Sequence, residues 1–424
     1  MARRTFEFAP VPNATTRALF SVPARQQLLK QHNLALLLRQ IAASENQTRA
    51  QLATRTGLTK ATVSTLVDAL MEARLVTERD PERGLIGRPG SPLALNAVGP
   101  AGLGVEINVD YVSACVVDLT GAMRWQMTSA NDNRLVRPQV VLKQAARMAS
   151  RLWDKARAAG LTVSGLGVAV PGLVDFEGVL HRAPNLRELE GVAVAEVLSE
   201  MIARPLGFLY CDNEANLAAL AEHWFGGRDE LADFVFVSGE IGVGAGIVIG
   251  GELFRGVRGL GGELGHVTVD AGGLPCSCNS RGCLETVAGQ EALLRAAGLW
   301  LNDTGNRAQA ADALVDRALA GDEVTLDVLA KAGSALGVAL ASFLNVLDLP
   351  SVVLGGLYAK LAPWLIEPVT SELSERVVNH SWTSTEVVVS SLGAEASVKG
   401  AAAMTVRRMI DDPAGMLGEV LAKT

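Results

Sequence analysis

Residues 262–285 read GELGHVTVDAGGLPCSCNSRGCLE and place one histidine and three of the chain's five cysteines in one short segment. His266, Cys276, Cys278 and Cys283 offer one imidazole and three thiolates, a set that Zn²⁺ binds tetrahedrally. Four protein ligands leave no open position on the ion, so the sequence predicts a closed, structural zinc site. The alternatives are unpaired thiols in a loop and a labile disulfide. Five cysteines in 424 residues are few for a disulfide framework, which favours the metal.

Around this segment, short β-branched runs alternate with helical stretches, which indicates an α/β fold. Gly242 to Gly246 lies between two strand-like runs and predicts a glycine-rich hairpin. Such a hairpin is either a tight turn or a loop whose backbone amides approach a phosphate. The expected strands are residues 102–107, 111–118, 123–129, 165–170, 206–210, 234–238 and 352–354.

Amide and carboxylate side chains are scattered through this α/β part. Proteins bind sugars with such side chains, because each buried hydroxyl needs a hydrogen-bonding partner. Any one of these residues is otherwise a helix cap or a surface polar residue. The candidates for sugar binding are Asn185, Asn213, Glu214, Glu263, His266 and Glu285.

Charge is distributed unevenly along the chain. Residues 1–96 carry a net charge of +6, whereas the whole chain carries −7, so the remainder carries −13. A basic piece joined to an acidic one indicates that the first piece meets a polyanion and the second does not.

The basic piece has the pattern of a helix-turn-helix. Residues 25–43 predict a first helix, and Thr48 with Gln51 forms a capping box that opens a second helix ending at Gly57. Thr59 begins a third helix with a polar, exposed N-terminal half. Two short helices joined by a tight turn place small polar side chains in a major groove.

Residues 75–96 follow and predict a two-stranded wing with a glycine-containing tip. The alternative for the whole piece is a solvated three-helix module whose polar face contacts nothing. The predicted contacts to DNA are Arg49, Thr59, Lys60, Thr62, Ser64, Thr65, Arg83 and Arg88.

Four motifs together resemble the ROK family of repressors, open reading frames and sugar kinases: Gly242–Gly246, Gly262–His266, the Cys-x-Cys…Cys-Leu-Glu cluster and Leu354–Gly356. The resemblance covers residues 102–405. The winged helix ahead of them resembles the repressor branch, with its xylose-type and N-acetylglucosamine-type regulators. The resemblance implies a two-lobed actin-like (ribonuclease H-like) domain, zinc on the histidine and three cysteines, and a sugar in the cleft. It also implies that His266 touches the sugar as well as the zinc.

The chain departs from the kinases of this family at three places. Glu214 stands where the kinases carry a catalytic Asp, and residues 106–110 lack the glycines of their first phosphate loop. Glu240 stands in the second loop where a small or hydroxyl residue is usual. Kinase activity is therefore not expected. A fourth departure, Asn279 in place of Gly, leaves the zinc ligands unchanged.

The sequence thus predicts a flexible arm at 1–24, a winged helix-turn-helix at 25–97 and a two-lobed sugar-binding domain at 98–424. We expect a cytoplasmic homodimer or homotetramer that represses carbohydrate-utilisation genes, binds a palindromic operator, responds to a sugar or sugar phosphate and contacts no membrane. The alternatives are a sugar kinase with an accessory DNA-binding domain and a regulator titrated by a protein partner.

Overall fold

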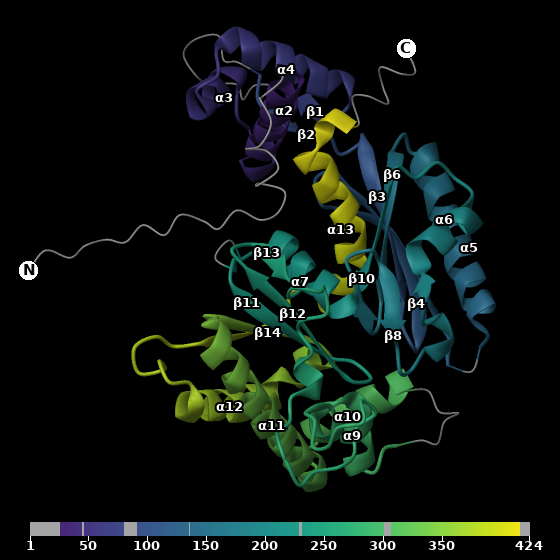
Figure 1. Ribbon diagram of the computed structural model, residues 1–424, viewed down its shortest axis with the longest axis vertical. Helices are drawn as coiled ribbons and strands as arrows, with labels where there is room; N and C mark the ends of the chain where they lie inside the picture. The colour runs from purple at the N-terminus through teal and green to yellow at the C-terminus, as the bar shows by residue number, and fades with distance from the viewer. Residues whose placement is uncertain are drawn as a thin grey trace, which may run out of the picture. The chain divides into compact units, whose positions relative to one another are not determined.

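The computed structural model describes residues 26–44, 46–79, 91–134, 136–228, 231–300 and 307–415. The chain divides into two compact units, residues 1–95 together with 408–424, and residues 96–407 (Figure 1). Each unit has its own hydrophobic core, so each is described by itself below.

The first unit contains three helices, α2 (Gln26–Ala43), α3 (Arg49–Thr56) and α4 (Lys60–Glu72). The predicted capping box is confirmed, because Thr48 accepts from the backbone of Gln51 and the Gln51 side chain accepts from Thr48. Gly57 ends α3 in the left-handed conformation that favours glycine. The buried faces of the helices form the core of the unit, which includes Leu34, Leu37, Leu38, Ile41, Leu52, Val63, Leu66, Val67 and Leu70.

The predicted wing has its two strands, β1 (Val76–Glu78) and β2 (Leu93–Leu95), which pair antiparallel with Thr77 opposite Ala94. The tip of the wing, with the predicted contacts Arg83 and Arg88, lies outside the described residues.

The first sheet of the second unit has the strand order β10-β6-β3-β4-β5. Its strands are β3 (Pro100–Ile107), β4 (Tyr111–Asp118), β5 (Met123–Ala130), β6 (Thr162–Val170) and β10 (Phe208–Asn213). Helices α5 (Pro138–Ala158) and α6 (Val194–Ile202) pack on one face through a core that contains Leu103 and Val105.

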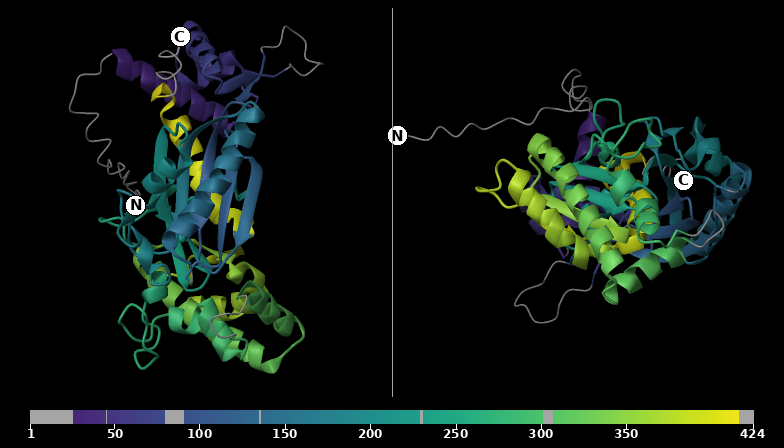
Figure 2. Two further views of the ribbon diagram at one scale, coloured as in Figure 1. Left: turned by 90° about the vertical axis from the view of Figure 1, so that its right-hand side faces the viewer. Right: turned by 90° about the horizontal axis from the view of Figure 1, so that it is seen from below.

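Helix α13 (Ala396–Asp411) packs on the other face of this sheet (Figure 2). Alternate residues of a strand point to opposite faces, so Gly102 and Gly104 face α13. A Cβ on Gly104 would collide with backbone atoms of Val398 and Ala402. Glycine therefore permits the helix to approach the sheet closely.

The second sheet has the order β13-β12-β11-β14-β15. Its strands are β11 (Phe234–Gly239), β12 (Val243–Ile249), β13 (Glu252–Phe254), β14 (Ser351–Gly356) and β15 (Glu386–Val389). Helices α11 (Glu323–Leu347) and α12 (Leu357–Arg376) belong to its core cluster, and α7 (Glu214–Phe225) packs against β12. Helix α11 has the length and hydropathy of a membrane span, but half of its most apolar window is buried, as in a core helix.

The prediction of a glycine-rich hairpin is wrong about where the turn lies. Gly244 and Gly246 lie within strand β12, and the turn that precedes them is at residues 240–242. A Cβ on Gly246 would lie 2.5 Å from the carbonyl oxygen of Ala215 in α7. The glycines are thus explained by the close packing of a helix on the strand.

The remaining elements of the second unit are small. A three-stranded sheet β7-β8-β9 lies next to the first sheet, and three helices follow the cysteine segment. Their bounds are β7 (Leu173–Val174), β8 (Val179–Arg182), β9 (Val192–Ala193), α8 (Glu285–Ala288), α9 (Gln290–Ala296) and α10 (Arg307–Leu319), with 3₁₀ turns at Arg187–Leu189, Leu264–His266 and Gly393–Glu395. The predicted α/β class is confirmed.

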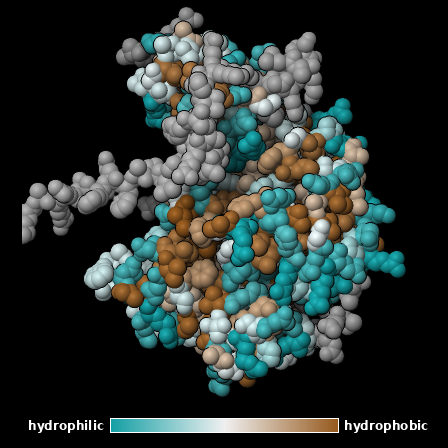
Figure 3. Space-filling model, viewed as in Figure 1, coloured by the Kyte–Doolittle hydropathy of each residue, from teal (hydrophilic) through white to brown (hydrophobic). Residues whose placement is uncertain are grey.

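The second unit also exposes large hydrophobic side chains. Val257, Val346, Val378 and Trp382 are between 81% and 99% exposed. Figure 3 shows hydrophobic residues gathered across the middle of one face of this unit, between hydrophilic areas. Contiguous exposed apolar surface is typical of interaction sites.

Candidate functional site

A cavity of about 130 Å³ in the second unit is lined by all six side chains that the sequence proposes for a sugar. Asn185 follows strand β8, and Asn213 and Glu214 lie at the junction of β10 with α7. Glu263 and His266 come from the 3₁₀ turn after β13, and Glu285 begins α8. The structure therefore brings together residues that are spread over a hundred positions of the sequence.

The junction of β10 and α7 positions two side chains that line this cavity, Asn213 and Glu214. Asn213 is the N-cap of α7, because its Oδ1 accepts from the backbone nitrogen of Ala215 at 2.8 Å. Its Nδ2 donates to the carbonyl oxygen of Gly172 at 3.0 Å and to Glu214 Oε2 at 3.1 Å. Asn213 thus holds the Glu214 carboxylate in place, and Glu214 lines the cavity beside it.

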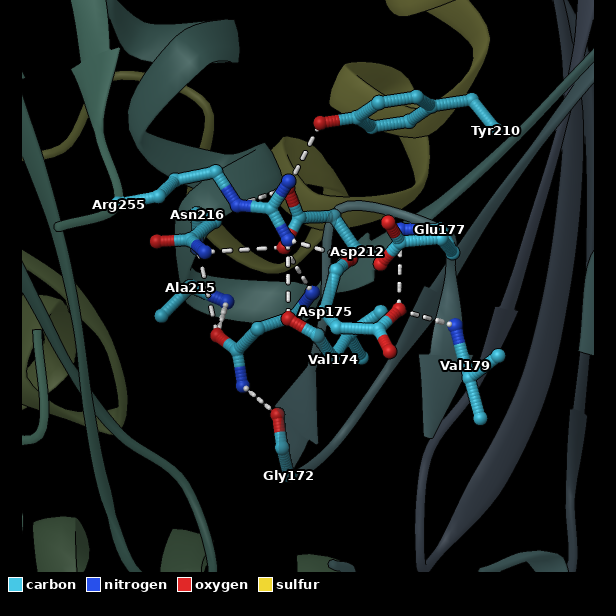
Figure 4. Close-up of polar contacts among 11 residues, drawn as sticks. Gly172, Val174, Asp175, Glu177, Val179, Tyr210, Asp212, Ala215, Asn216 and Arg255 are labelled. Carbon is cyan, nitrogen blue, oxygen red and sulfur yellow. Dashed lines mark hydrogen bonds and ion pairs between the residues drawn. The ribbon is translucent and has the colours of Figure 1, made fainter. Parts of the chain in front are cut away.

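A buried ion pair lies behind this junction. Arg255 Nε is 3.3 Å from Asp212 Oδ2, and both side chains are at least 92% buried. Arg255 Nη2 also donates to the carbonyl oxygens of Val174 and Asp175, each at 2.9 Å (Figure 4). Arg255 follows β13 of the second sheet, whereas Asp212 lies near the end of β10 of the first, so the pair ties the two sheets together at the base of the cavity.

Asp212 is satisfied by further donors. Its carboxylate accepts from the Tyr210 hydroxyl at 2.7 Å and from Asn216 Nδ2 at 3.0 Å. Burial raises the pKa of Asp212 above its ordinary value, and the Arg255 guanidinium opposes that rise. The network therefore fixes the strand end from which Asn213 and Glu214 extend.

Carboxylates accumulate beside the cavity. Burial raises the pKa of Glu106 to about 7, and burial together with the charge of Glu106 raises the pKa of Glu240 to about 7. Burial also raises the pKa of Glu214 well above its ordinary value. Glu106 Oε1 accepts from the Tyr111 hydroxyl at 2.7 Å, but Glu106 Oε2 is buried without a hydrogen-bond partner. Burial thus disfavours the ionised form of these three carboxyl groups.

The candidate metal centre brings the four predicted ligands into one group. One donor atom from each of His266, Cys276, Cys278 and Cys283 lies within 4.8 Å of the others. Cys276 Sγ is 3.6 Å from His266 Nδ1, and Cys278 Sγ is 3.6 Å from Cys283 Sγ. Tetrahedral Zn²⁺ with bonds of ~2.3 Å to sulfur and ~2.0 Å to nitrogen requires separations of roughly 3.5–3.8 Å. The donors therefore fit this ion, and all three thiols are free of disulfides.

Two neighbours shape the metal centre. Glu263 Oε2 is 3.7 Å from His266 Nε2, so a carboxylate faces the ring nitrogen that points away from the sulfur of Cys276. Asn279 has φ = 72°, in the left-handed region, where asparagine is tolerated better than other non-glycine residues. The departure from glycine at this turn is thus compatible with its conformation.

The predicted DNA-contacting side chains of the first unit have several internal partners. Thr59 caps α4 by accepting from the backbone nitrogen of Thr62, and the two hydroxyls are 2.9 Å apart. Arg49 Nη1 is 3.0 Å from Ser64 Oγ and 2.6 Å from Asp68 Oδ1. Lys60 and Thr65 are exposed. The accessible half of α4 therefore carries Lys60, Thr62 and Thr65. Arg49, which lies on α3, binds the side chains of Ser64 and Asp68 on α4.

Sequence reasoning missed the ion pair between Asp212 and Arg255. They lie 43 positions apart, and no motif links them. The weak signal was an arginine, Arg255, in a glycine-rich stretch, together with an acid at the end of a strand.

Comparisons with known proteins agree with the two-unit division. The ROK family profile matches residues 102–408, and the MarR family profile matches residues 35–84. The xylose repressor of Bacillus spizizenii is 29% identical over 388 residues, which cover 92% of this chain and 98% of that protein. The N-acetylglucosamine repressor of Escherichia coli O6:H1 is 26% identical, with 91% and 94% covered.

Among solved structures, a ROK family transcriptional regulator, a homologue of the Escherichia coli MLC protein, has a TM-score of 0.75 and 24% identity. The likeness covers 93% of this chain and 100% of that one. The predicted order of a winged helix followed by a two-lobed actin-like domain is therefore confirmed.

Proposed function

The chain belongs to the ROK family, and from that premise we propose that it is a sugar-responsive transcriptional repressor of carbohydrate-utilisation genes. The observation that carries the proposal is the presence, in one chain, of a winged helix and of a cavity lined by amides and carboxylates suited to hydroxyl groups. The repressor relatives match along almost the whole chain, winged helix included.

In the proposed ligand site, Asn185, Asn213, Glu214, Glu263, His266 and Glu285 bind the hydroxyls of the sugar. Coupling to DNA requires that the sugar bind the two conformations of the repressor with different affinity. The Arg255–Asp212 pair joins the end of the first sheet to the second sheet, so a change in the angle between the sheets would have to strain or break it.

The test uses the full chain and a DNA fragment that it selects from a random pool. We expect at least one sugar from a panel of pentoses, hexoses and N-acetylhexosamines to change the DNA affinity by ~5–150-fold, the usual range of allosteric coupling. The control is the same titration with Asn185→Ala, which removes an amide from the cavity and leaves the winged helix untouched. An unchanged DNA affinity with every sugar, in protein that binds DNA, would favour control by a protein partner.

In the proposed metal centre, the ion is Zn²⁺ and its role is structural. Bound there, zinc would fix the loop that carries His266 and so position Glu263 at the cavity. The four donors come from one short segment, and the ion would therefore order that segment rather than supply an open coordination position.

In the proposed DNA-binding surface, the N-terminal half of α4 enters the major groove, with Lys60, Thr62, Ser64 and Thr65 nearest the bases and Arg49 and Thr59 supporting them. Arg83 and Arg88 would reach phosphate or the minor groove from the wing. In this proposal the protein acts as a homodimer or homotetramer, and its two-fold symmetry matches a palindromic operator. Because the operator is DNA, the proposed location of the protein is the cytoplasm.

The chain is not proposed to be a kinase. Phosphoryl transfer depends on donors that stabilise the negative charge of the transferred phosphate. Glu106, Asp110 and Glu240 instead bring carboxylates to the positions of the kinase phosphate loops. Burial and its acidic neighbour Asp132 raise the pKa of Asp110 to about 6, so a nucleotide would add charge where charge is already unfavourable.

A further inference from the structure

We infer that the effector is a disaccharide, with one ring in the cavity and the second ring in a larger pocket beside it. The inference rests on the proposed function and deepens it, since that function assigns a sugar to the cavity and nothing to its neighbour. This adjoining pocket has a volume of about 930 Å³ and is lined by α9, α11, the start of α8, the cysteine segment and residues 184–187, all in the second unit.

The adjoining pocket and the cavity have part of their lining in common. The shared residues are Pro184, Asn185, Ile241, Gly242, Ser277 and Glu285. Two of them, Asn185 and Glu285, belong to the proposed sugar-binding set, so a ring that they hold lies at the boundary. A Cβ on Gly242 would collide with the Glu285 carboxylate, which therefore keeps its place at this boundary because residue 242 is glycine. A ligand held there can extend into the adjoining pocket.

The cavity alone is small for a ligand site. Small-molecule sites usually measure roughly 300–1,000 Å³ and bury most of the surface of their ligand. The cavity, at about 130 Å³, is smaller than this range, whereas the adjoining pocket falls within it. The two together therefore suit a ligand larger than one sugar ring.

Part of the lining of the adjoining pocket is apolar. Leu274 of the cysteine segment and Val324 of α11 line it, and they are 66% and 57% exposed although both are large hydrophobic side chains. Val287 and Val328 line it as well. A pyranose ring has a face of C–H groups, and such a face would remove this apolar surface from water.

The polar part of the lining consists mainly of paired charges. Arg295 Nη2 lies 2.8 Å from Glu291 Oε1 on α9, and Lys331 Nζ lies 2.6 Å from Asp327 Oδ2 on α11. The remaining charged residues of the described lining are Arg187 and Glu285. Acidic and basic side chains are thus equal in number, so the pocket offers donors and acceptors without an excess of either charge. Hydroxyl groups, which both donate and accept, match such a lining.

Arg187 can distinguish the second ring from the first, because it lines the adjoining pocket but not the cavity. Its Nε is 3.4 Å from the carbonyl oxygen of Pro184, and within the described residues no carboxylate pairs with its guanidinium. A guanidinium has five N–H donors in a fixed geometry. Arg187 is therefore placed to donate to hydroxyls of the second ring.

The experiment measures dissociation constants by calorimetry on the full chain. The monosaccharides are D-xylose, D-glucose and N-acetyl-D-glucosamine, each also as its terminal phosphate ester, and the disaccharides are xylobiose, cellobiose, maltose and N,N′-diacetylchitobiose. We expect at least one disaccharide to bind at least ~10-fold more tightly than the monosaccharide that it contains, because its second ring adds contacts in the adjoining pocket.

Two variants test the place of the second ring. Ala292→Trp puts a large side chain on the wall that α9 contributes to the adjoining pocket and should remove most of the preference for the disaccharide. Arg187→Ala should reduce the preference by about threefold or more. Neither residue lines the cavity, so both variants should bind the monosaccharide as the parent does. The matched control, Ala330→Trp, adds the same side chain at an exposed position of α11 that lines neither space and should leave the preference unchanged.

The outcomes separate this inference from the function on which it rests. A monosaccharide that binds as tightly as every disaccharide overturns the inference and leaves a sugar-responsive repressor. If no sugar binds, both are overturned. An ester that binds more tightly than every disaccharide, and loses that gain in Ala292→Trp, assigns the pocket to a phosphate and overturns the second ring.

The variants decide the remaining case, a parent that prefers a disaccharide. If Ala292→Trp and Arg187→Ala both keep the full preference, the second ring lies elsewhere and its assignment to the adjoining pocket is overturned. Retained binding of the monosaccharide shows that a variant is folded. If Ala292→Trp does not fold, Arg187→Ala decides the outcome alone.

Discussion

Replacing Arg255 by methionine tests how much the buried ion pair with Asp212 contributes to the stability of the second unit. The change leaves the Asp212 carboxylate without its cation and removes two hydrogen bonds to backbone carbonyls. Because Asp212 is fully buried, the expected loss of unfolding free energy is ~3–5 kcal/mol, the usual cost of removing one partner of a buried pair. At roughly 2 °C per kcal/mol for a unit of this size, the melting temperature should fall by ~6–10 °C.

The loss should depend on pH in a definite direction. Burial already raises the pKa of Asp212 above its ordinary 3.8, and removal of Arg255 raises it further. An acid whose pKa is higher in the folded state destabilises the fold as pH rises above the unfolded value, because the folded form must give up a proton that it holds more tightly. The deficit of Arg255→Met should therefore be larger at pH 8 than at pH 5.

Thermal unfolding followed by circular dichroism measures both effects. Arg255→Met with Asp212→Asn removes the uncompensated charge and should recover about half of the deficit and most of its pH dependence. Lys331→Met breaks an exposed ion pair of 2.6 Å and, as the control, should cost at most about 1 kcal/mol. The reasoning is refuted if Arg255→Met melts within about 2 °C of the parent, or if its deficit shrinks as pH rises.

Three further predictions concern the metal, the DNA and catalysis. We expect metal analysis to find one equivalent of zinc in the parent and none in Cys278→Ser, which should also be less stable and bind sugar more weakly; folded, sugar-binding parent protein without zinc would contradict the assignment. Replacing Thr62 and Ser64 by alanine should weaken DNA binding by ~1–3 kcal/mol for each contact to a base that is lost. If gel-shift titrations of the variant match those of the parent, α4 does not bind in the groove as proposed. Glu214→Asp should keep sugar binding and release no ADP in a coupled assay, and turnover at ~1–100 s⁻¹ in parent or variant would contradict the repressor-only interpretation.

Local features of the fold were predictable from the sequence. The caps at Thr48 and Thr59 and the stop at Gly57 depend on residues at most three or four positions away, and the sequence contains them in full. The histidine and the three cysteines of the metal centre were predictable because they lie in one short segment of the sequence, and such a cluster of metal-binding side chains is uncommon without a metal.

Features that depend on a distant partner were not predictable in this way. Gly244 and Gly246 resemble a turn in the sequence, and only the approach of α7 shows why glycine is required on a strand. Arg255 meets Asp212 only after the two sheets come together. The six residues of the cavity were predictable through the family resemblance, because their spacing alone fits helix caps equally well, and Asn213 does cap a helix.

The packing of α13 on the first sheet has a consequence for how the protein is made. The strand that carries Gly104 contacts Ala402, which the ribosome adds 298 residues later. At about 5–20 residues per second, that interval lasts roughly 15–60 s. One face of the first sheet therefore remains uncovered until translation is nearly complete. The winged helix, with α2, α3 and α4, is synthesised early and makes mostly local contacts. A chain cut short before α13 would contain the complete sequence of the winged helix and a sensor domain unable to close its core.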